Sequence, residues 1–160
     1  MKQDHVDTIL AQWQVQRPDL DCSPMGVIGR MDRANHLMKL GLEEVFKQFG
    51  LMSSEFDILA TLRRAGEPVT PTEMYQTLMF SSGAMSTRVD GLVKRGLVVR
   101  QASETDRRSC LVMLTDEGRT LIDAVVTAHV ENEHQMLNVL TEKEQATLAS
   151  LLRKWLASRE

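Results

Sequence analysis

Four small residues near the middle of the chain are suited to reading DNA bases: Ser82, Gly83, Ser86 and Thr87. Hydroxyl groups both donate and accept hydrogen bonds, and glycine lets a helix backbone approach a base edge closely. If these residues open a helix, its first amide groups also favour a phosphate. An ordinary amphipathic surface helix explains the same four residues equally well, so the neighbouring segments must decide between the two interpretations.

The segment that follows carries two arginines, Arg107 and Arg108, between two runs that alternate as strands do. These runs are residues 97–102 and 110–114. Arginine at the tip of a hairpin can enter a DNA minor groove, where the negative potential is deepest, and Asp106 can orient its neighbour. A solvated charged turn is the alternative, and it is less common directly after a candidate recognition helix.

Helix signals position these residues. Thr70 is a good N-cap, Pro71 suits the first helical position and Glu73 completes a capping box, so we expect a helix over about 70–79. A second helix is expected from 81 or 82 to about 95, with Gly96 as its stop. Helix, turn, helix and hairpin in this order form a winged helix-turn-helix, which places one helix in the major groove.

The second helix has two distinct sides. Met85, Val89 and Leu92 fall on one apolar stripe, which should pack inward and leave the small polar side free. Arg88 lies at the edge of that stripe, and a partly buried guanidinium needs an anion. Asp57 is the expected partner, because an unpaired carboxylate among apolar neighbours is costly.

Residues 53–120 resemble the MarR family of bacterial transcription regulators, notably the run DRRSCLVMLTDEGR (106–119), which is similar to the family's wing and next helix. The resemblance extends over nearly the whole chain. It implies a homodimer that binds a pseudo-palindromic operator in double-stranded DNA. It also implies repression by default, with release when a small, often phenolic or anionic molecule binds.

A finer resemblance is to the urate-responsive, PecS-like branch of that family. Trp13, Asp57, Arg88 and Arg100 stand where the branch has the same four residue types, and residues 17–30 are also similar to it. The resemblance implies that these four residues bind the effector and that the effector is urate. Salicylate-like acids, other purine products and antibiotics satisfy the same charges.

The chemistry of such a site is simple. Two arginines can hold a planar anion and an indole can lie against its ring. If the anion draws Arg88 from its resting partner, or repels Asp57, the DNA-reading helix must shift. Ligand binding and DNA release would then share one coupling free energy, typically about 1–3 kcal/mol. A purely structural Asp–Arg pair with a core tryptophan is the alternative.

Charge and composition agree with this assignment. The net charge is −3, yet residues 81–115 carry 6 basic and 3 acidic side chains and are the positive part of the chain. No apolar run is long enough for a membrane span, and the first residues show no signal-peptide pattern, so we expect a cytoplasmic protein. We expect no cofactor and no membrane partner.

The remaining segments indicate long helices. We expect them over about 4–16, 23–49 and 53–65, where Ser53 is the predicted N-cap, and then over 115–140 and 141–158. The fold class is therefore mainly α with a small β-hairpin wing. We expect one domain over 1–160: N-terminal helices over 1–50 for dimerisation and the ligand pocket, the DNA-binding lobe over 51–114, and C-terminal dimerisation helices over 115–160. The last two helices have more apolar surface than one lobe is expected to cover, which a second copy of the chain would cover.

Other classes of function fit less well. A thiol-based redox sensor would use Cys22, although Asp19 and Asp21 beside it oppose formation of the thiolate. A winged helix used only for protein contacts is a further alternative. Metal sensing has thin support: His129 and Glu133 are one helical turn apart, but His5, His36 and His134 have no ligand spacing. We therefore interpret His129 and Glu133 as part of a solvated helix face and expect no metal. An enzyme is not expected, because a phosphate loop and a nucleophile elbow are both missing from the sequence.

Overall fold

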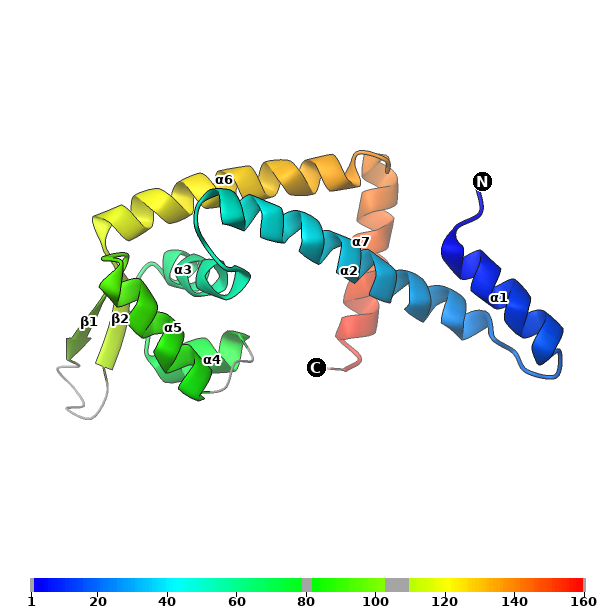
Figure 1. Cartoon of the computed structure of the whole chain (residues 1–160), viewed down its shortest axis with the longest axis horizontal. Helices are drawn as coiled ribbons and strands as arrows, with labels where there is room; N and C mark the ends of the chain where they lie inside the picture. The colour runs from blue at the N-terminus through cyan, green and yellow to red at the C-terminus, as the bar shows by residue number, and fades with distance from the viewer. Residues whose placement is uncertain (1, 79–81, 103–109, 160) are drawn as a thin grey trace. The chain divides into compact units, whose positions relative to one another are not determined.

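The computed structural model of the chain describes residues 2–78, 82–102 and 110–159 (Figure 1). It is mainly helical with one antiparallel hairpin, which confirms the fold class. In chain order the elements are α1 (His5–Gln16), α2 (Ser23–Gln48), α3 (Ser53–Ala65), α4 (Pro71–Leu78), α5 (Ser82–Lys94), β1 (Val98–Ala102), β2 (Cys110–Leu114), α6 (Asp116–Leu137) and α7 (Glu142–Leu156).

The chain divides into two compact units, Met1–Gly41 and Leu42–Glu160. We call the first the N-terminal unit and the second the reader unit. The division falls inside α2, so the last residues of that helix belong to the reader unit.

In the N-terminal unit, α1 is held on α2 by apolar and charged contacts. Val6 is 3% exposed and faces Gly29 of α2. Arg30 of α2 bonds Asp4 at 2.8 Å and Asp7 at 2.6 Å, and these two acids also form the capping box that begins α1. These contacts attach the start of α1 to α2.

In the reader unit, α3 lies at the centre and contacts α4, α5, α6 and β2 (Figure 1). Its Ile58 and Leu59 are fully buried. The predicted apolar stripe of α5 is confirmed, because Met85, Val89 and Leu92 are at most 1% exposed. Burial of this stripe fixes which side of α5 remains outside.

The hairpin pairs Val98 with Leu114 and Ala102 with Cys110. Val69, in the link between α3 and α4, adds a bridge to Val112 through hydrogen bonds of 3.0 and 2.8 Å. β2 is thereby attached to the helical part of the reader unit on one side and to β1 on the other.

Most of the predicted helix starts are confirmed. Thr70 with Glu73 and Thr141 with Glu144 form the expected hydrogen bonds. The predicted cap at Ser53 is wrong by one residue: Met52 occupies the N-cap, and Glu55 accepts from its amide at 2.9 Å. A buried Glu side chain replaces a Ser hydroxyl at this end.

Within the described ranges, no helix combines the length and the apolar character that a bilayer crossing demands.

Candidate DNA-reading face and anion site

The predicted reading residues lie on the outer side of α5. Gly83, Ser86 and Thr87 are exposed, and a Cβ atom added at Gly83 would meet nothing within 4 Å. The Thr87 hydroxyl donates to the Gly83 carbonyl at 3.1 Å, which leaves its oxygen lone pairs free to accept. Ser82 begins α5, but its side chain lies outside the described residues. We call these four residues the reading face.

The wing arginines Arg107 and Arg108 lie outside the described residues. The two strands that lead to them are formed as expected. The wing assignment therefore stays a prediction at its tip.

The far end of α5 is anchored to α3 by a pair that the sequence did not reveal. Arg95 donates to Glu55 at 3.2 Å, and the other Glu55 oxygen accepts from the Met52 amide. Glu55 is only 7% exposed, so both of its oxygens need partners, and both have them. A Glu three residues after a helix start could have indicated the cap, but its link to Arg95 depends on the tertiary fold.

Arg88 does not form the expected ion pair with Asp57. In the described part of the chain its guanidinium is instead within 3.4 Å of the Met52 sulfur. A thioether is a weak acceptor, so this contact satisfies the guanidinium poorly. The prediction of a resting Arg88–Asp57 pair is therefore wrong for this structure, although both residues remain candidates for binding an anion.

The pKa of Asp57 is affected by burial and by two residues outside α5. Burial raises the pKa of its carboxyl, while Arg64 on the same helix and His129 on α6 act to lower it. The residues that act on the pKa of Asp57 therefore lie on α3 and α6. Its half-buried carboxylate is the costly group that the sequence indicated.

His129 is more buried than the sequence led us to expect. We interpreted it as part of a solvated helix face, but its side chain is 17% exposed and its ring stacks on Phe46, with 5.6 Å between centroids. Its Nε2 lies 3.2 Å from Glu133, whereas Nδ1 is buried without a hydrogen-bond partner. The aromatic side chains of α2 and α3 that cover it are brought together only by the fold.

Arg100 is paired with an acid of the reading helix. Its Nη2 lies 2.9 Å from Asp90, and both side chains are partly exposed. An unpaired carboxylate at Asp90 could accept from a cytosine amino group or repel phosphate. Asp90 lies one turn beyond Ser86, so this ion pair borders the reading face.

The four predicted ligand residues are distributed over both units. Asp57, Arg88 and Arg100 belong to the reader unit, and Trp13 belongs to α1 of the N-terminal unit, where it is 39% exposed. Arg88 is on α5 and Arg100 is tied to α5 through Asp90. Both guanidinium groups are therefore mechanically connected to the helix that carries the reading face.

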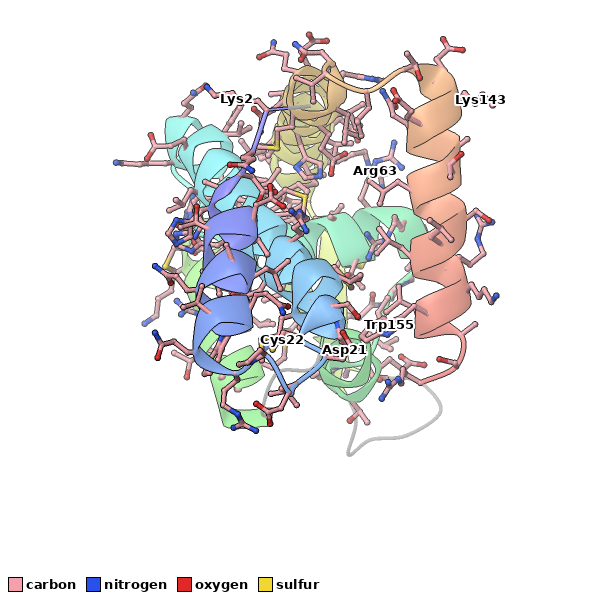
Figure 2. All side chains as sticks on the ribbon, turned by 90° about the vertical axis from the view of Figure 1, so that its right-hand side faces the viewer. Lys2, Asp21, Cys22, Arg63, Lys143 and Trp155 are labelled. Atoms are coloured by element: carbon pink, nitrogen blue, oxygen red, sulfur yellow. The ribbon has the colours of Figure 1, made fainter. Side chains whose placement is uncertain are left out.

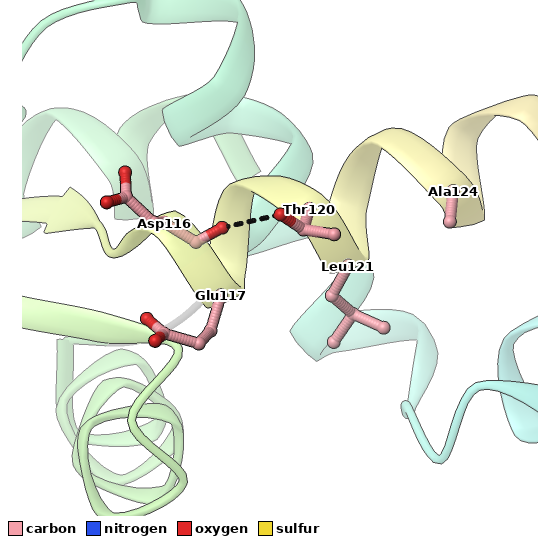
Figure 3. Close-up of a pocket in the computed structure, with 5 residues that line it drawn as sticks. All are labelled: Asp116, Glu117, Thr120, Leu121 and Ala124. Atoms are coloured by element: carbon pink, nitrogen blue, oxygen red, sulfur yellow. Dashed lines mark hydrogen bonds between the residues drawn. The ribbon is translucent and has the colours of Figure 1, made fainter.

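Two surface hollows of the structure do not involve these residues. One follows the first turns of α6, where the Thr120 hydroxyl donates to the Asp116 carbonyl at 2.9 Å (Figure 3). The other is lined by Thr8, Ala11, Gln12, Val15 and Gln16 of α1. Each is lined by a single helix, so neither encloses a ligand from several sides.

Cys22 is half-buried and directly follows Asp21 before the first turn of α2 (Figure 2). Arg17, the cation of this connector, is bonded to Asp19 at 2.8 Å. Within the described ranges, no three His, Cys, Asp or Glu side chains gather as a metal site would require.

Comparisons with known proteins show the family of the chain. Residues 49–109 match the model of the MarR family. Over 149 residues the chain is 44% identical to the HTH-type transcriptional regulator PecS of Dickeya dadantii, covering 92% of this chain and 90% of the relative.

Solved structures show the same fold. A mutant of Escherichia coli MarR in complex with operator DNA matches with a TM-score of 0.72 and 28% identity, over 83% of this chain and 94% of that one. A MepR–DNA complex from Staphylococcus aureus matches with a TM-score of 0.70 and 24% identity, over 83% of this chain and 96% of that one.

Proposed function

The chain belongs to the MarR family of DNA-binding transcriptional regulators and is PecS-like, and from that premise we propose that it is a dimeric repressor released from its operator by a small aromatic anion. Urate is the first candidate for that anion. The family is one of regulators and not of enzymes. The observation that carries the proposal is that α5 presents the reading face on one side and connects to Arg88 and Arg100, two guanidinium groups with weak or exposed partners.

DNA contact is proposed for the reading face and for Arg107 and Arg108. The exposed residues Gly83, Ser86 and Thr87 are small enough for the backbone of α5 to approach base edges. The arginines would reach a minor groove beside the site of α5. Half-sites of a dimer would then lie about one helical turn, roughly 10 base pairs, apart.

A second copy of the chain is proposed as the cover for exposed apolar side chains. In α7 no described residue is buried, although the helix has a clear apolar side. Large apolar side chains that are at least 40% exposed occur in α2 and α7: Met25, Val27, Ile28, Leu37, Met38, Leu40, Leu148, Leu151, Trp155 and Leu156. Surface of this kind on long helices is typical of an interface between subunits.

Release of DNA is proposed to begin at the arginines. An anion that binds Arg88 replaces only a thioether contact, and one that binds Arg100 must displace Asp90. Because a charge-assisted hydrogen bond is stronger than a thioether contact, the guanidinium of Arg88 gains by the exchange. The exchange changes what holds α5 and hence the position of the reading face. Trp13 would lie against the ring of the anion, and Asp57 would be repelled by its charge.

The experiment that tests this function starts from DNA selection. Purified protein is used to recover duplex fragments from a random library, and the complexes are challenged with urate, salicylate and other purines. We expect an enriched pseudo-palindrome and its release by urate, accompanied by quenching of Trp13 fluorescence in a Trp155→Phe background. If none of these anions releases the operator, the effector proposal is contradicted, while the DNA-binding assignment still stands.

A further inference from the structure

Asp90 is an acid on the side of α5 that the reading face occupies, where a free carboxylate would repel phosphate. It is half-exposed, and its carboxylate is bonded to Arg100 of β1 at 2.9 Å. The chain between the two residues contains the end of α5 and the turn at Gly96, which has a φ of 70°. The ion pair therefore closes a ring of eleven residues, 90–100, across the junction of recognition helix and wing.

Several other contacts hold this junction in the described part of the chain. Within the described residues, Arg95 is bonded to Glu55 and so points toward α3. The Thr115 hydroxyl donates to the Gly96 carbonyl at 2.7 Å and holds the turn itself. Beyond the turn, β1 pairs with β2 among the residues that the structure describes. Asp90 and Arg100 add an ion pair between α5 and the middle of β1.

We propose that Asp90 is a positioning residue for DNA binding: through Arg100 it fixes the angle between the recognition helix and the wing, and it does not read a base. The pair also neutralises the acid on a surface that faces a polyanion. Operator binding depends on α5 and the wing engaging neighbouring grooves at the same time, so a loosened angle weakens binding without loss of any direct DNA contact.

The effect of Asp90→Asn on operator affinity should change sign when Arg100 is replaced. With Arg100 present, Asp90→Asn breaks the link and weakens operator binding. With Arg100 already replaced by Gln, the acid is unpaired and only repels phosphate, so the same Asp90→Asn change strengthens binding. A base-reading Asp90 has no such dependence on Arg100.

The test is a double-mutant cycle on the full-length protein, with Asp90→Asn, Arg100→Gln and the double variant. Dissociation constants for a selected operator duplex are measured by fluorescence anisotropy. We expect each single variant to bind about two- to fivefold more weakly, as is usual for partly exposed pairs, and the double variant to bind no more weakly than the worse single one. Asp90→Glu, which keeps a carboxylate, should restore most of the affinity.

The Arg63–Asp123 pair is the matched control. It joins α3 to α6 at 2.7 Å with side-chain exposures of 41% and 50%, close to the 36% and 50% of Arg100 and Asp90. Its own cycle, with Arg63→Gln and Asp123→Asn, should leave the operator affinity unchanged. An equal loss of affinity in both cycles would reduce the effect of Asp90 to general stability and overturn the proposal.

Two further results would overturn it. One is an equal effect of Asp90→Asn in the presence and absence of Arg100. The other is a changed preference at one base pair when the Asp90→Asn protein selects fragments from a random library, because that marks a residue that reads a base. An unchanged consensus with reduced affinity supports the positioning role.

Discussion

Glu55 at the start of α3 holds Arg95 just beyond the end of α5 at 3.2 Å, and the same carboxylate accepts from the Met52 amide. The nearly buried carboxylate of Glu55 thus caps the start of α3 and also anchors the end of α5. Because α5 carries the reading face, the position of that face depends on an acid that itself lies in the interior. Glu55 therefore serves both the stability of the reader unit and the placement of its reading face.

Replacement of Glu55 by Ala should lower the free energy of unfolding by about 1–3 kcal/mol, because the Met52 amide loses its partner and Arg95 loses its anion. Urea denaturation followed by circular dichroism measures this change. Glu44→Ala is the control, since Glu44 is 73% exposed and lies 3.9 Å from Lys47 in an exposed pair. Similar small effects of both substitutions would show that Glu55 is not an anchor.

Two glycines should respond in opposite directions to alanine. A Cβ atom at Gly118 would overlap the Leu97 carbonyl oxygen and lie 2.9 Å from its carbonyl carbon, so Gly118→Ala should destabilise by about 1–3 kcal/mol. A Cβ atom at Gly91 would meet nothing within 4 Å, so Gly91→Ala should stabilise α5 by about 0.5–1 kcal/mol. Thermal unfolding of both variants checks this, and destabilisation by Gly91→Ala would contradict the open space beside α5.

Asp57 should make stability depend on pH. Burial raises the pKa of its carboxyl above the ordinary 3.8, so the folded chain keeps that proton to a higher pH than the unfolded chain. The contribution of Asp57 to the free energy of unfolding therefore falls as pH rises from 3.8 through the raised pKa, and it is lowest above that pKa.

Asp57→Asn removes this penalty, so the variant should gain more stability at about pH 7 than at about pH 4. Urea denaturation at the two pH values measures the difference, with the exposed Asp32→Asn variant as control. A gain of the same size at both pH values would exclude the titration of Asp57 as its cause. If Asp57 also belongs to the effector site, the stabilised variant should respond less to urate.

Arg30 should control the attachment of α1. Hydrogen bonds from its guanidinium lower the pKa of the Asp4 carboxyl below the ordinary 3.8. The stabilisation from the Arg30–Asp4 ion pair is therefore present above pH 3.8 and is lost as the pH falls through the lowered pKa. At neutral pH, Arg30→Ala should accelerate hydrogen exchange in α1, while the exposed Arg33→Ala should not. Unchanged exchange in the Arg30 variant would show that the contact at Val6 suffices.

Local signals allowed much of this fold to be predicted. Thr70, Pro71 and Glu73 act within one helical turn, so the start of α4 follows from their spacing alone. The same holds for Thr141 with Glu144. The buried stripe of α5 follows from its periodicity.

The contacts that the sequence did not predict are of two kinds. Some join residues that are far apart in the chain, and others involve a residue that has several possible partners. Arg88 and Asp57 are both partly buried, and only the fold brings Arg88 to Met52 and lets Arg64 and His129 act on the pKa of Asp57. The pairing of Asp90 with Arg100 depends on how the chain turns at Gly96. His129 looked solvated because the aromatic rings that cover it come from α2 and α3.

The most direct test of the central claim is the affinity of the purified protein for a selected operator duplex as a function of salt. Anisotropy titrations between about 50 and 200 mM KCl should show a log–log slope near −0.9 for each phosphate that the protein neutralises, hence a loss of several orders of magnitude. If no duplex is enriched at low salt, or if the affinity stays constant across this range, the assignment of α5 and the wing as a DNA-reading surface is contradicted.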